Sequence, residues 1–146
     1  MSESEPESPA EYLFAQGKMY DWKQDKSPAA ASLARANFQQ AAAMGHTGAA
    51  RALAHLLYEG RGGPQDREQA LLLLWSMFKR GDSESLEELA DLLASYAKSL
   101  GEPSEARRAS KMAEHLEQLN LSLAQATDFM RGLAHKRRSS ASKGEP

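Results

Sequence analysis

The sequence has no cysteine, valine or isoleucine among its 146 residues, and its only β-branched residues are Thr47 and Thr127. Because strands rely on Val, Ile and Thr, this shortage argues against a β-sheet protein. Without cysteine the chain has no disulfide, thiol nucleophile or cysteine-ligated metal site. The longest apolar run, residues 70–75, is far shorter than the roughly 20 residues of a membrane-spanning helix. No signal-peptide pattern begins the sequence, so we expect a cytoplasmic protein without a membrane partner.

Alanine and leucine supply most of the apolar content, and both residues rank high on the scale of helix propensity. The formal net charge is −2, but it is unevenly distributed. Residues 1–9 carry three Glu and no basic residue, whereas residues 136–146 carry four Lys or Arg and one Glu. Both ends are poor in apolar residues, so we expect an acidic disordered tail over 1–9 and a basic one over 136–146. They flank a helical domain over 10–135.

Glycine and proline divide this domain into helical segments at short intervals. Ser27 followed by Pro28 is typical of an N-cap and a first helical residue, and Gly45 and Gly81 are natural helix ends. Asp66 is a suitable N-cap for the segment that follows it. The expected helices cover residues 10–23, 28–44, 47–59, 66–80, 82 or 83 to the break at 101–103, 104–119 and 121–135.

The segments repeat when the sequence is shifted on itself by 36 residues. Gly45 then falls on Gly81, Leu53 on Leu89 and Ala54 on Ala90, and the same shift aligns Ala34 with Ala70. Two helices of ~14 residues and two short turns fill such a period, which is typical of a stacked helical hairpin. The repeat predicts units over about 10–44, 45–80 and 81–119.

One of these units resembles a known family. Gly-His-Thr-Gly-Ala-Ala at 45–50, Leu53-Ala54, Gly-Arg-Gly-Gly-Pro-Gln-Asp at 60–66, Ala70 and Gly81 are similar to the Sel1-like repeat, a relative of the tetratricopeptide repeat. The resemblance is clearest over residues 38–90. It implies an all-α fold, a right-handed α-solenoid of about three antiparallel helix pairs, and we expect the helix over 121–135 to cap the stack.

The resemblance also implies a binding surface. In relatives of this architecture the first helices of successive hairpins line a concave face, and exposed polar residues there touch ligands. The 36-residue shift aligns Arg51 with Glu87 and His55 with Asp91, so these four residues are predicted neighbours. Along the rim we expect Tyr58, Lys98 and Lys18. The alternative interpretation of Glu87 and Asp91 is an ordinary solvated acidic face.

Catalytic chemistry has little support in the sequence. No two of His46, His55, His115 and His135 stand three or four residues apart, as a local metal site would require. His46 fits a turn between repeats. The glycines at 60–63 lack the Lys-Ser/Thr and the preceding strand of a phosphate-binding loop. We therefore expect no enzyme activity, no metal and no cofactor.

The leading hypothesis is a non-enzymatic interaction module, an adaptor, assembly factor, or chaperone- or immunity-like binder, which holds a peptide or protein on its concave surface. The resemblance implies such roles, often in bacteria. The alternative hypothesis is a nucleic-acid accessory protein that acts through the basic cluster at 136–138. The bulk charge does not favour nucleic acid as the partner, and the sequence does not define an oligomeric state.

Overall fold

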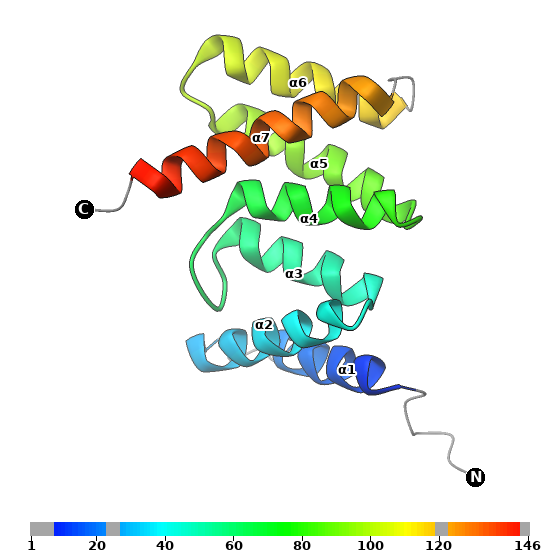
Figure 1. The fold of residues 1–146 in the computed structure, drawn as a ribbon. Coiled ribbons are helices and arrows are strands. Elements are labelled where there is room, and N and C mark those ends of the chain that lie inside the picture. The colour runs from blue at the N-terminus through cyan, green and yellow to red at the C-terminus, as the bar shows by residue number, and fades with distance from the viewer. Residues whose placement is uncertain (1–7, 23–26, 119–122, 144–146) are drawn as a thin grey trace. The chain divides into compact units, whose positions relative to one another are not determined.

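A computed structural model describes residues 8–22, 27–118 and 123–143 of the chain, and these residues form helices and turns without a strand. The helices are α1 (Pro9–Trp22), α2 (Pro28–Ala43), α3 (Thr47–Glu59), α4 (Arg67–Lys79), α5 (Glu84–Ser99), α6 (Pro103–Gln118) and α7 (Leu123–Lys143) (Figure 1). The all-helical class predicted from the sequence is confirmed for this part of the chain.

The chain divides into two compact units. Unit 1 ends at Asp66 and contains α1, α2 and α3, whereas unit 2 begins at Arg67 and contains α4 to α7. The expected domain over 10–135 is therefore split at the end of the glycine-rich turn. The predicted tail over 1–9 lies outside the described residues except for Ser8 and Pro9, the latter being the first residue of α1.

The last helix is longer than the sequence analysis expects. It continues to Lys143, so the expected helix end at 135 lies too early and most of the predicted disordered basic tail is helical. Lysine, arginine and alanine are good helix formers, and no glycine or proline occurs between Gly132 and Gly144. Residues 121–122 and 144–146 lie outside the described part of the chain.

In unit 1, α1 and α2 pack as a hairpin and α3 packs on α2 (Figure 1). Small residues allow this close approach, since a Cβ on Gly17 of α1 would lie 2.6 Å from the Phe38 ring of α2. Phe38 is 1% exposed, and its ring centroid lies 5.9 Å from that of Phe14. An aromatic contact therefore lies between α1 and α2, two closely packed helices.

In unit 2, α5 pairs with α4 and α6, and α7 runs back across the unit and contacts α4 (Figure 1). Leucines of α4 and α5 are fully buried, among them Leu74 and Leu89. Over residues 125–136 of α7, where side chains are described, the buried residues are Ala126, Met130 and Leu133, which recur at the spacing of one helical face.

The same helix-to-helix junction occurs in both units. At α2–α3, the Gly45 N–H donates to the Ala42 carbonyl and the His46 N–H to the Ala41 carbonyl; at α4–α5, Gly81 and Asp82 donate to Phe78 and Met77 in the same way. Both glycines have positive φ, 93° and 106°, which an L side chain adopts only with strain. These are Schellman motifs, and each of their residues is shifted by 36 positions from its counterpart.

The residue after each glycine then supplies a local acceptor for the next helix. His46 Nδ1 accepts from the Ala49 N–H at 3.0 Å, and Asp82 Oδ2 accepts from the Ser85 hydroxyl at 2.6 Å. Ala49 and Ser85, again 36 residues apart, are both 0% exposed. The expected role of His46 in a turn is confirmed, and so is the capping role of Ser27, whose hydroxyl accepts from the Ala30 N–H.

Candidate functional site

Three of the predicted site residues lie on α3 in unit 1. Arg51 and His55 are one helical turn apart and share a face of α3, and Tyr58 follows a further turn along. All three are half-buried, and each already interacts with another group of the chain. Part of their polar surface is therefore used within the protein.

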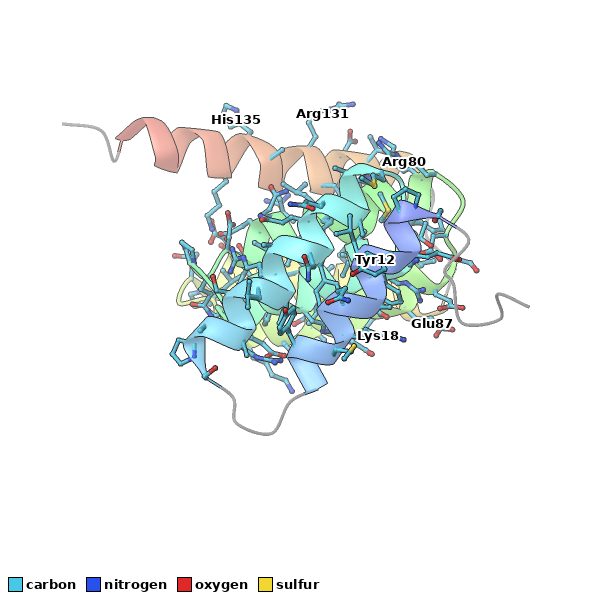
Figure 2. The ribbon with its side chains drawn as sticks, turned by 90° about the horizontal axis from the view of Figure 1, so that it is seen from below. Tyr12, Lys18, Arg80, Glu87, Arg131 and His135 are labelled. Carbon is cyan, nitrogen blue, oxygen red and sulfur yellow. The ribbon has the colours of Figure 1, made fainter. Side chains whose placement is uncertain are left out.

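The other three predicted site residues lie on α5 in unit 2. Glu87, Asp91 and Lys98 are exposed, and Glu87 projects into solvent from its helix (Figure 2). Glu87 and Asp91 share a face, as Arg51 and His55 do on α3. A surface that contains all six residues would join the two units, and it stays a prediction.

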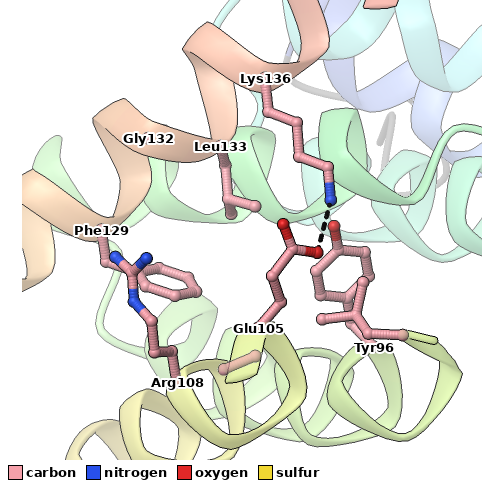
Figure 3. A pocket seen from close by; sticks show the side chains of 9 residues that line it. Tyr96, Glu105, Arg108, Phe129, Gly132, Leu133 and Lys136 are labelled. Atoms are coloured by element: carbon pink, nitrogen blue, oxygen red, sulfur yellow. Dashed lines mark hydrogen bonds and ion pairs between the residues drawn. The ribbon is translucent and has the colours of Figure 1, made fainter. Parts of the chain in front are cut away.

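Unit 2 contains a pocket that the sequence analysis did not single out. It has a volume of about 260 Å³ and lies between the last turn of α5, the first half of α6 and the middle of α7 (Figure 3). The lining residues are Tyr96, Leu100, Glu105, Arg108, Ala109, Phe129, Gly132, Leu133 and Lys136. Two aromatic rings and two leucines thus share one cavity with three charged side chains.

The charged side chains of this pocket come from α6 and α7. Lys136 Nζ lies 3.2 Å from Glu105 Oε2, and both side chains are a little under half exposed (Figure 3). Arg108 reaches toward Phe129 on the other side of the pocket (Figure 3). Below them the Tyr96 hydroxyl donates to Glu68 of α4 at 3.2 Å. An ion pair therefore connects α6 and α7 next to the apolar residues of the pocket.

Gly132 lines this pocket from the interior of α7, and no neighbouring atom requires a glycine there. The other described helical glycines, Gly17 and Gly48, lie so close to aromatic side chains that a Cβ would be crowded. A Cβ on Gly132 would have no heavy atom within 4 Å, and its φ is not in the left-handed region. Glycine in a helix interior is unfavourable, and here no packing or backbone constraint calls for it.

Replacing Gly132 by alanine should therefore stabilise the protein. We expect Gly132→Ala to raise the free energy of unfolding by about 0.5–1 kcal/mol, because it removes the entropic cost of a helical glycine without a clash. Urea denaturation followed by far-ultraviolet circular dichroism measures this change. A loss of stability would show that the space beside Gly132 is filled by the protein itself.

The glycine-rich loop at 60–66 is an inter-helix turn, as the sequence analysis expects. Gly60 ends α3 in the left-handed conformation, and the loop packs on α2. Arg35 of α2 is 8% exposed and donates to the carbonyls of Arg61 at 3.3 Å and Pro64 at 3.0 Å. Arg61 forms an ion pair with Asp21 of α1. The loop is therefore held by hydrogen bonds from Arg35 within unit 1, a role of Arg35 that the sequence did not predict.

Within the described residues, no three His, Asp or Glu side chains are grouped as metal ligands would be. None of the described helices has the length and apolar character to cross a membrane.

The sequence matches no family model, and it matches no curated protein. The Sel1-like resemblance therefore rests on the quoted sequence motifs alone and stays a prediction.

The pocket residues carry only a weak signal in the sequence. Phe129 and Leu133 lie among the apolar positions of the last helix, but Arg108 and Lys136 resemble any surface cation. Gly132, in the middle of an otherwise regular helical segment, is the signal that could have pointed to them. The contact between α6 and α7 is needed to bring these residues together.

Proposed function

We propose that this protein is a non-enzymatic, Sel1-like binding module, which holds a protein or peptide partner on the concave side of stacked helical hairpins. In this arrangement three antiparallel pairs, α1–α2, α3–α4 and α5–α6, form a right-handed superhelix, and α7 caps it. Arg51, His55, Tyr58, Glu87, Asp91 and Lys98 line the binding surface.

The observation that carries the proposal is the junction repeated after 36 residues. The same Schellman geometry recurs at residues 41–46 and 77–82, and in both cases the residue after the glycine accepts a hydrogen bond from the residue three positions later. In this register Arg51 and Glu87, or His55 and Asp91, are equivalent positions of α3 and α5. Repetition of a capped hairpin is typical of helical solenoids, which use extended surfaces for recognition. Preformed helices lose little conformational entropy when a partner binds, and this favours a binding role.

A pull-down from the native host tests the proposal, with wild type and an Arg51→Ala/Asp91→Ala variant as baits. We expect recovery of the specific partner to fall at least about fivefold, the effect of losing roughly 1 kcal/mol of interface energy. The matched control is Arg80→Ala/Asp128→Ala, which removes the same side-chain types from exposed positions outside α3 and α5.

The variants are compared only at equal thermal stability, because Arg51 also interacts within the chain. If Arg51→Ala lowers stability, Asp91→Ala alone replaces the double variant, since Asp91 is exposed. Equal recovery by wild type and by the α3–α5 variant would refute this binding surface.

A further inference from the structure

We propose that the pocket between α5, α6 and α7 anchors an acidic segment of the partner, with an apolar side chain in the cavity and a neighbouring carboxylate on Arg108. This inference rests on the proposed function, because it names the chemical class of the partner and a second place of contact. It concerns unit 2 alone.

The residues that form the walls of the pocket favour binding of an apolar side chain of the partner. Tyr96, Ala109 and Leu133 are at most 7% exposed, and they present their apolar atoms to a cavity of about 260 Å³ that remains open to the surface (Figure 3). Phe129 adds a half-buried aromatic ring. A leucine or phenylalanine of a partner would be removed from water on several sides here, which is the usual position of an interface hot spot.

The charged residues of the pocket favour an acidic residue next to this apolar side chain in the partner. Lys136 is paired with Glu105, and in the part of the chain that the structure describes no carboxylate pairs with Arg108. Arginine binds a carboxylate through two parallel hydrogen bonds, so Arg108 suits an Asp or Glu beside the anchor.

The surrounding helix strengthens this preference. The sequence of α7 has five basic residues and one acidic residue, although the chain as a whole has a net charge of −2. Arg131 and His135 project outward from this helix (Figure 2). Among the residues that line the pocket, Arg108 and Lys136 outnumber the single carboxylate of Glu105, and this excess of positive charge attracts acidic segments. The apolar walls of the cavity favour a peptide, whose side chains can be apolar, over a nucleic acid, whose backbone carries a phosphate at every nucleotide.

Gly132 is the second, independent observation. It lines the pocket, and no contact or backbone conformation in α7 requires a glycine there. Because Gly132 lines the pocket and is exposed, a large side chain at this position would stand beside the opening of the cavity. Glycine at this position lowers the stability of the helix and improves no packing contact. Its presence is explained if the missing side chain leaves room for a ligand.

Three pools of synthetic nine-residue peptides test the proposal in titrations of the isotope-labelled full chain, followed by NMR. The first pool has Leu or Phe in the centre and Asp, Glu, Ser or Gly elsewhere. The second replaces the central residue by Ser, and the third replaces the acidic residues by Lys. We expect the first pool to shift the amide signals of Phe129, Gly132 and Leu133, and to bind at least about tenfold more tightly than the others.

Variants locate the binding site. We expect Gly132→Trp, which fills the pocket, and Arg108→Glu, which reverses its charge, each to weaken binding at least about tenfold. Arg107→Glu is the matched control for charge, because Arg107 is an exposed neighbour on α6 that does not line the pocket. Gly132→Ala is the control for helix stability. If Gly132→Trp fails to fold, Arg108→Glu and its control still decide the question.

The possible outcomes separate this inference from the proposed function. Peptide binding that shifts signals of α3 and α5 and is insensitive to Gly132→Trp would overturn the pocket and leave the concave surface intact. No binding by the first pool would also overturn the inference, while the pull-down with the Arg51→Ala/Asp91→Ala variant judges the concave surface separately. If a short single-stranded DNA shifted the same signals equally, the site would attract anions in general. That result would overturn its proposed specificity for a peptide with an apolar anchor.

Discussion

Gly62→Ala is expected to destabilise the protein by about 3 kcal/mol. Gly62 has a φ of +75°, where a left-handed conformation costs an L residue roughly 1–2 kcal/mol. In addition, its Cβ would lie 2.3 Å from the backbone oxygen of Ala31 on α2. Helical backbone cannot move aside as a flexible side chain can, so the loop itself must shift, and overpacking of this kind costs typically 1–3 kcal/mol.

The shift of this loop would also disturb Arg35, whose guanidinium donates to the carbonyls on both sides of Gly62. Urea denaturation measures the loss, and Gly101→Ala is the matched control. Gly101 lies in a turn without positive φ, and a Cβ there meets nothing within 4 Å. An unchanged midpoint for Gly62→Ala would mean that the loop does not pack on α2 as described.

Phe38→Ala is expected to cost about 3–5 kcal/mol, the usual result of removing a large ring from a closely packed core. Phe38 is 1% exposed, lies against the backbone of Gly17, and contacts the Phe14 ring at a centroid distance of 5.9 Å. The hairpin of α1 and α2 holds these groups on both sides, so collapse into the cavity would be only partial. Most of the aromatic contact between the two helices would be lost.

The matched control for this prediction is Leu33→Ala on the same helix. Leu33 is 48% exposed, so its truncation should change the free energy of unfolding by less than about 1 kcal/mol. Thermal and urea denaturation of both variants provides the comparison. Similar losses for Phe38→Ala and Leu33→Ala would contradict the assignment of Phe38 to the core.

The local features of the fold were predictable because they depend on residues close together in the sequence. Ser27 caps α2, His46 lies in a turn, and Gly45 and Gly81 end their helices within one residue of the expected positions. The exception is the end of α7, where low apolar content suggested a disordered tail although Lys, Arg and Ala favour continuation of the helix. Low apolar content therefore does not by itself mark the end of a helix.

The candidate pocket was not predictable in the same way. Tyr96, Arg108 and Phe129 lie on three different helices, and nothing in their local sequence distinguishes them from other core or surface residues. The packing of Gly62 on Ala31 likewise joins segments about 30 residues apart. The predicted surface residues Arg51 and Asp91 depend on a different signal, since a repeat relates distant positions through sequence alone, and their common surface stays a prediction.

The sequence by itself determined that the chain is helical, where most helices begin and end, and that a hairpin junction recurs after 36 residues. These properties follow from backbone propensity, caps and glycine conformation, whose physical range is a few residues. Only the tertiary structure decided that Arg35 holds the glycine-rich loop and that α7 returns to form a pocket with α5 and α6. Those features arise from contacts between side chains distant in sequence, and helix packing alone brings them together.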